Sequence, residues 1–211
     1  SYTITVTGIG NYDFTQTKTF TIGKKPMTDA MVTLTGAPFT YNGSVQKPAV
    51  TVSDGSPSII SASDYTISND GNINAGNYTV TVTATATGNY SGSGSQSYTI
   101  NPYTLNATNT SVILDQSTFV YDRTAKKPNV LLVKVGDTMV VPTFTTAYSN
   151  NVNASNTATV TVTGSGNFTG SVDKTFVITP KSVTSDMIKF DKENFVYDGT
   201  NQKPTVPSKT A

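Results

Sequence analysis

The chain of 211 residues carries 14 Lys and Arg against 13 Asp and Glu, and it contains no His, Cys or Trp. The missing His and Cys exclude a zinc site built on those residues, a Ser-His-Asp triad, a Cys-His dyad, an iron–sulfur cluster and any disulfide. Because the formal net charge is +1, with 13% charged residues and no apolar run near the roughly 20 residues of a membrane span, we expect no nucleic-acid partner and no direct membrane insertion.

Thr is over-represented, followed by Ser and Asn, and apolar residues make up 36% of the chain. This composition favours strands and turns over helices. Leu is scarce, and no window carries apolar residues at helical spacing. The sequence therefore predicts an all-β protein.

The first element in chain order is a hairpin, in which apolar residues alternate with Thr from Tyr2 to a Gly-Asn-Tyr turn at Tyr12. A second strand follows and ends with Phe20 and Ile22. The same hairpin recurs twice, from Thr79 to Tyr90 with the closing pair Tyr98 and Ile100, and from Ala158 to Phe168 with the closing pair Phe176 and Ile178. The alternation places Val80 and Val82 on a core face and the neighbouring Thr residues on a wet face.

The next element is an aromatic-x-Tyr turn followed by Lys-Pro. It reads Phe39-Thr-Tyr41 with Lys47-Pro48, then Phe119-Val-Tyr121 with Lys127-Pro128, then Phe195-Val-Tyr197 with Lys203-Pro204. Between this turn and the following hairpin lies a third motif, residues 64–76, which ends in Asn74-Ala75-Gly76 and is matched less well by residues 147–155. Three motifs in a constant order indicate a tandem repeat.

The repeat period is close to 78 residues, the separation of Tyr12 from Tyr90 and of Tyr90 from Phe168. We therefore expect two complete repeats, 24–101 and 102–180. Residues 1–23 are read as the C-terminal hairpin of a preceding repeat and residues 181–211 as the N-terminal part of a following one. About six or seven short strands per repeat, with turns at regular spacing, predict β-sandwich modules that stack end to end as an extended rod.

These motifs resemble the MBG or YDG-type tandem modules of bacterial surface proteins, most clearly at Tyr41 to Pro48, Asn74 to Tyr90 and Ala158 to Gly170. The departures are Arg123, where the family has a turn Gly, and Ser155, where it has the Gly after Asn-Ala. The resemblance implies immunoglobulin-like modules of a secreted or wall-anchored, extracellular, adhesin-like protein. They would act as stalk, spacer or cell-adhesion repeats, with neighbouring repeats as partners.

The candidate binding residues are the aromatic residues at the hairpin tips, Tyr12, Tyr90 and Phe168, because an exposed ring there can stack on a sugar. The competing interpretation is that each ring folds over the neighbouring module or the turn, and we prefer it because the residue recurs in every copy. Tyr41, Tyr121 and Tyr197 are interpreted as packing residues whose hydroxyls reach a backbone partner.

Three further hypotheses rank lower. Lys47 before Pro48 is a candidate for a Lys-Asn isopeptide bond, with Asp64 as the assisting acid. Residues 69–74 resemble a calcium loop without its closing Glu, and the Thr rows resemble part of an ice-binding face. The leading expectation is a non-catalytic structural module without cofactor or metal, and the alternative is a glycan- or mucin-binding module that contacts host or environmental sugars through its aromatic tips.

Overall fold

The computed structural model of the chain describes residues 1–55, 59–135 and 142–206. In these ranges the regular elements are β-strands and three single-turn 3₁₀ helices, η1 (Asp29–Met31), η2 (Ala62–Asp64) and η3 (Ser185–Met187). The prediction of an all-β protein is confirmed. No helix in the described part of the chain is long and apolar enough to cross a membrane.

The chain divides into two compact units. Unit 1 consists of Ser1–Thr110, Lys134–Thr145 and Thr163–Ser171, and unit 2 of Ser111–Val133, Thr146–Val162 and Val172–Ala211. The first repeat, residues 24–101, therefore lies within unit 1. The second repeat, residues 102–180, contributes to both units.

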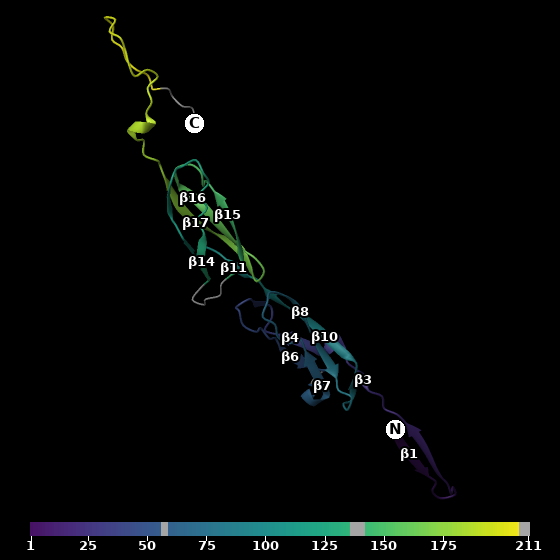
Figure 1. Cartoon of the computed structure of the whole chain (residues 1–211). Coiled ribbons are helices and arrows are strands. Elements are labelled where there is room, and N and C mark those ends of the chain that lie inside the picture. Colours follow the sequence, from purple (N-terminus) through teal and green to yellow (C-terminus); the bar gives the residue numbers. More distant parts are fainter. Residues whose placement is uncertain (56–58, 136–141, 207–211) are drawn as a thin grey trace. The chain divides into compact units, whose positions relative to one another are not determined.

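The N-terminal hairpin consists of β1 (Tyr2–Thr7) and β2 (Thr15–Phe20), drawn in purple in Figure 1. The strands are antiparallel, with Tyr2 opposite Phe20 and Thr7 opposite Thr15. The rings of Tyr2 and Phe20 stack with centroids 5.4 Å apart. Every residue of both strands is exposed.

The first repeat is built on a four-stranded sheet in the order β5 (Phe39–Thr40), β10 (Ser93–Asn101), β8 (Gly76–Ala84) and β7 (Tyr65–Ser68). A separate antiparallel pair is formed by β4 (Val32–Thr35) and β6 (Ala49–Val52). A short parallel pair joins β3 (Lys25–Pro26) to β9 (Tyr90–Ser91). The predicted faces of the hairpin hold, since Val80 and Val82 on β8 are fully buried while Thr79 and Thr83 are exposed.

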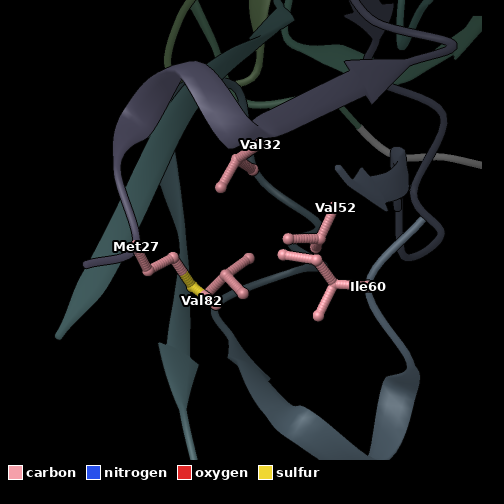
Figure 2. Packing of buried hydrophobic residues seen from close by; sticks show 5 residues of the cluster. All are labelled: Met27, Val32, Val52, Ile60 and Val82. Carbon is pink, nitrogen blue, oxygen red and sulfur yellow. The ribbon is translucent and has the colours of Figure 1, made fainter. Parts of the chain in front are cut away.

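In the first repeat, the four-stranded sheet and the β4–β6 pair meet through apolar side chains. Val82 from β8 lies against Val32 from β4 and Val52 from β6, and Met27 and Ile60 complete this cluster (Figure 2). A second cluster brings Val80, Tyr98 and Ile100 together with partly buried residues that include Leu34 and Phe39. Burying one such aliphatic or aromatic side chain stabilises the fold by about 1.5–3 kcal/mol. The four-stranded sheet and the β4–β6 pair are therefore held together mainly by these contacts.

The second repeat has the same plan. Its main sheet has the order β11 (Tyr103–Leu105), β17 (Phe168–Thr179), β16 (Ser155–Gly164) and β15 (Phe144–Ser149), and β13 (Thr118–Val120) also pairs with β17. A separate pair is formed by β12 (Thr110–Leu114) and β14 (Val130–Val135). In unit 2, Ala158, Phe176 and Ile178 form a buried cluster with Phe119 packed against it.

The turn after the aromatic-x-Tyr motif needs a left-handed residue in all three copies. Gly43 has φ +79°, Gly199 has φ +83°, and Arg123 in the same place has φ +71°. The preceding side chain braces the turn each time, as Asn42 Oδ1 accepts from the Ser44 amide at 2.9 Å and Asp122 Oδ1 from the Thr124 amide at 2.9 Å. Arg123 therefore preserves the turn and carries the backbone strain that Gly avoids.

Candidate functional site

The three hairpin tips, residues 10–12, 88–90 and 166–168, share the sequence Gly-Asn-aromatic but lie in different surroundings. The side chain of Tyr12 is 73% exposed, Tyr90 is half-buried, and Phe168 is 6% exposed. A sugar can stack on a ring only where a ring face is open to solvent. Of the three candidate residues, Tyr12 therefore presents the most accessible ring.

Phe168 packs against residues of the first repeat and of the start of its own repeat, all within unit 1. Its ring meets Tyr41 edge to face, with centroids 5.3 Å apart, and Tyr103 at 6.4 Å. Phe168 also begins the parallel pairing of β17 with β11, where it lies opposite Tyr103. The aromatic tip of the second repeat thus covers the Tyr41 turn of the first.

Asn167, next to Phe168, uses both ends of its side-chain amide on the Asn-Ala loop of the first repeat. Its Oδ1 accepts from the Ala75 backbone N–H at 2.7 Å, and its Nδ2 donates to Asn74 Oδ1 at 2.9 Å. Its backbone carbonyl accepts from the Tyr103 N–H at 2.9 Å. The loop is itself braced, because the Tyr78 hydroxyl donates to the Asn74 carbonyl at 2.8 Å. We call the contact set of Asn167 and Phe168 with Tyr41, Asn74 and Ala75 the repeat joint.

Close backbone approaches around the repeat joint require small residues. A Cβ built on Gly170 would lie 2.5 Å from the Leu105 carbonyl oxygen, and the residue has φ +76°. A Cβ built on Gly164 would lie 2.9 Å from Phe168 Cβ. Real Cβ atoms do not approach so closely without a shift of the backbone. Gly170 is therefore needed for β11 and β17 to meet as they do, and Gly164 for the close turn to Phe168.

Tyr90, at the tip of the first repeat, belongs to a polar triad. Its hydroxyl donates to Asp54 Oδ2 at 2.8 Å, and Lys25 Nζ lies 3.1 Å from the same oxygen. The hydrogen bond from Tyr90, followed by the one from Lys25, lowers the pKa of the Asp54 carboxyl, and the bond to Asp54 raises the pKa of the Tyr90 hydroxyl. The triad ties the tip to the loop after β6.

The residues of the lower-ranked hypotheses have structural partners. The side chain of Lys47 is 61% exposed and forms an ion pair with Asp70 Oδ2 at 2.5 Å. In the calcium-like loop, Asn72 Nδ2 donates to the Tyr98 hydroxyl at 2.9 Å, and Asn74 Oδ1 accepts from Asn167. Within the described ranges, no group of three His, Cys, Asp or Glu side chains is placed to hold a metal ion.

Two partners of the tips were not predicted. The Asn-Ala pair recurs as Asn74-Ala75 and Asn153-Ala154, so a signal existed in the sequence, but it does not reveal that the next hairpin binds there. Asp54 has no such signal. The residue at the same distance from Lys-Pro in the second repeat is Lys134, so no recurring pattern marks this position as a partner of Tyr90.

No family model matches this chain, and no curated protein and no solved structure matches it.

Proposed function

We propose that the chain is a set of immunoglobulin-like β-sandwich modules that serve as stalk or spacer and adhesion repeats of a secreted or wall-anchored bacterial surface protein. The observation that carries the proposal is the repeat joint. The aromatic residue at the tip of one repeat, Phe168, packs on the neighbouring repeat, and Asn167 makes two hydrogen bonds to the Asn-Ala loop of that neighbour. Packing of one repeat on its neighbour is the kind of contact on which structural arrays of repeats depend.

The sandwich assignment is supported by the arrangement within each repeat. In the first repeat, β4 and β6 lie across an apolar core from the sheet that contains β8 and β10. The outer face of β8 carries Thr79 and Thr83, which are exposed. Modules with wet outer faces that meet through a small, directional joint suit a spacer, which must present little adhesive surface along its length.

Small-angle X-ray scattering of the whole chain tests the stalk proposal. We expect an extended particle, and a compact globule would contradict the proposal. The double variant Asn167→Ala with Phe168→Ala should broaden the distribution of maximum dimensions by loosening the repeat joint. The matched control, Asn11→Ala with Tyr12→Ala at the exposed tip, should leave the distribution unchanged.

Surface exposure is tested separately on intact cells of the source organism with an antibody raised against the chain. Labelling of intact cells supports the proposed location. Labelling that requires permeabilised cells contradicts it, whatever the scattering shows.

The second candidate function is glycan or mucin binding, and the exposed ring of Tyr12 is the observation that favours it. A glycan array probed with the chain tests this function. If the tips carry binding, Tyr12→Ala should abolish the signal and Phe168→Ala should retain it, because the Phe168 ring is already buried. A signal that survives Tyr12→Ala excludes the ring of Tyr12 as the binding group.

A further inference from the structure

The turn after Tyr41 contains the one Asn-Gly pair of the sequence, Asn42-Gly43. Both residues are exposed to solvent. The residue at the place of Asn42 is Asp122 in the second repeat and Asp198 in the third copy of the motif. The first repeat therefore carries a side-chain amide in a turn where the other two copies carry a carboxylate.

Two features of Asn42 favour a reaction at its side chain. The backbone nitrogen of the residue after an Asn can attack the side-chain carbon Cγ of that Asn, and the Cβ of the attacking residue is the main steric obstacle. Gly43 has no Cβ, whereas every other Asn in the sequence precedes a residue that has one. The exposure of the turn also gives water free access to the product of the attack.

The geometry of the turn brings the reacting groups together. The Ser44 N–H donates to Asn42 Oδ1 at 2.9 Å, and this hydrogen bond closes a ring of atoms that contains both Asn42 Cγ and the Gly43 nitrogen. Gly43 has φ +79° within this ring. During attack on Cγ, negative charge collects on Oδ1, where the Ser44 N–H is already placed to stabilise it. The turn therefore supplies the nucleophile, the electrophile and a donor to the oxygen that becomes charged.

The third copy of the turn shows that a carboxylate fits at this place. Asp198 Oδ1 accepts from the Thr200 N–H at 2.9 Å and from the Thr200 hydroxyl at 2.6 Å. The hydrogen bonds from the side chains of Thr200 and then Gln202 lower the pKa of the Asp198 carboxyl, so the turn favours its ionised form. The first repeat carries Ser44 and Gln46 at the places of these two donors. An Asp at position 42 would therefore find the same partners.

We propose that Asn42 is a site of spontaneous deamidation through a cyclic imide formed with Gly43. The Gly43 nitrogen loses its proton and bonds to Asn42 Cγ, and the bond from Cγ to Nδ2 breaks, so that Nδ2 leaves as ammonia. Water then opens the imide. Attack of water at Cγ breaks the new bond and leaves Asp, and attack at the backbone carbonyl carbon of residue 42 breaks the original peptide bond and leaves isoaspartate. Water is the only co-reactant, and nothing is oxidised or reduced. This inference does not depend on the proposed function.

The site lies directly beside the repeat joint. Tyr41 precedes residue 42, packs its ring on Phe168 and donates its N–H to the Asn101 carbonyl at 2.9 Å. The Asp product leaves the length of the main chain unchanged. The isoaspartate product adds one methylene carbon to the main chain directly after Tyr41, so it displaces the Tyr41 ring and loosens the repeat joint.

Mass spectrometry of the full chain after long incubation at neutral pH and physiological temperature tests the site. After digestion in ordinary water, the peptide that contains Asn42 should be heavier by about 1 Da, or by about 3 Da if the incubation was in water labelled with oxygen-18, because a solvent oxygen replaces the amide nitrogen. Peptides that contain only other Asn residues should change far more slowly. An Asn42 peptide of unchanged mass overturns the proposal.

Thermal unfolding tests the effect on the repeat joint. The unchanged chain should melt at a lower temperature after the incubation than before it, whereas Gly43→Arg, incubated equally, should keep its melting temperature. Asn42→Asp should melt like the fresh unchanged chain, because its main chain has the ordinary length. Equal melting temperatures of fresh and converted samples of the unchanged chain would overturn the loosening of the joint.

An exchange between the two complete repeats tests the role of Gly43. Arg123 adopts φ +71° in the second repeat, so the chain itself shows that Arg is compatible with this turn. Gly43→Arg should therefore keep the turn and preserve the Asn42 amide. The reciprocal double variant, Asp122→Asn with Arg123→Gly, should create a new site, and the peptide that contains position 122 should gain the same mass. Conversion of Asn42 in Gly43→Arg at the rate of the unchanged chain, or no conversion at position 122 in the double variant, overturns the proposal.

Discussion

The ring of Phe168 meets the ring of Tyr41 edge to face with centroids 5.3 Å apart, although the two residues are far apart in the sequence and belong to different repeats. Edge-to-face pairs gain about 0.5–1.5 kcal/mol beyond their buried area. The neighbouring Asn167 reinforces the contact through Ala75 and Asn74. The end of one hairpin is thereby fixed to two loops of the preceding repeat.

Replacing Phe168 by Ala should lower the free energy of unfolding by about 3 kcal/mol, because the buried ring leaves a cavity against Tyr41 and Tyr103. Urea denaturation measures this loss. Tyr12→Ala is the matched control, and since that ring is 73% exposed it should change stability by less than about 0.5 kcal/mol. Equal effects at the two positions would show that the repeat joint does not form in solution.

Replacing Asn167 by Asp should destabilise the repeat joint by about 1–3 kcal/mol, because the donor that faces Asn74 Oδ1 becomes a charged acceptor. Thermal unfolding at neutral pH measures the change, with Asn11→Asp as the matched control at the exposed tip. Because protonation returns a donor to the Asp side chain, the gap between the two variants should narrow in acid. A gap that does not change with pH would contradict this account of the amide pair.

The Tyr90–Asp54 hydrogen bond should make stability depend on pH at both ends of the range. The pKa of Asp54 is lowered, so its contribution is complete above the unfolded value of 3.8 and is lost as pH falls through the folded value. The pKa of Tyr90 is raised, so its contribution is complete below 10.0 and is lost as pH rises through the folded value.

Melting temperatures of the unchanged chain and of Tyr90→Phe, measured from acid to alkali, check this dependence. The difference between the two chains should be largest on the neutral plateau and shrink toward both ends. Tyr148→Phe is the control, because the Tyr148 hydroxyl donates to the Pro128 carbonyl, which does not titrate. If the melting-temperature difference caused by Tyr90→Phe varied with pH as little as that caused by Tyr148→Phe, the bond to Asp54 would contribute nothing to stability.

Replacing Arg123 by Gly should stabilise the second repeat by about 0.5 kcal/mol, because Gly relieves the left-handed strain at φ +71° at some cost in unfolded-state entropy. Chemical denaturation measures the gain. Gly43→Ala in the first repeat makes the opposite change at φ +79° and should destabilise by about 1 kcal/mol. A loss of stability in Arg123→Gly would mean that the Arg side chain makes a contact that outweighs its strain.

Gly92 and Gly170 occupy the same place after their hairpin tips and both have φ +76°, but their surroundings differ. Nothing lies within 4 Å of a Cβ built on Gly92, whereas a Cβ on Gly170 would lie 2.5 Å from the Leu105 carbonyl oxygen. Gly92→Ala should cost about 1 kcal/mol for backbone strain, and Gly170→Ala about 1–3 kcal/mol more for the clash. Denaturation curves that coincide for the two variants would contradict the close approach of β11 and β17.

Much of each repeat could be predicted because the relevant signals are local. The alternation around Val80 and Val82 identifies a strand and its buried face, since successive side chains of a strand point to opposite sides. The spacing of the aromatic-x-Tyr and Lys-Pro motifs predicts a turn in each repeat and marks Arg123 as a departure from it, and the backbone at Arg123 keeps the conformation that Gly43 has. The length and order of the motifs are enough to predict these strands and turns.

The partners of the tips could not be predicted in this way. Asp54 pairs with Tyr90 across 36 residues of sequence, and Asn167 reaches Asn74 across 93. A hydrogen bond at such separation depends on how the intervening strands fold, and neither residue carries a local mark of it.

Local patterns of residues suffice to predict that this chain is made of strands, where they turn, and which of their faces are apolar, because backbone sterics and the two-residue period of a strand act over a few neighbours. The three similar Gly-Asn-aromatic tips acquire different surroundings only in the folded chain, with Tyr12 open, Tyr90 bonded to Asp54 and Phe168 buried on Tyr41. Burial and hydrogen bonding differ between the tips because each requires two surfaces that meet. A tip acquires them only when the chain brings a complementary loop to meet it.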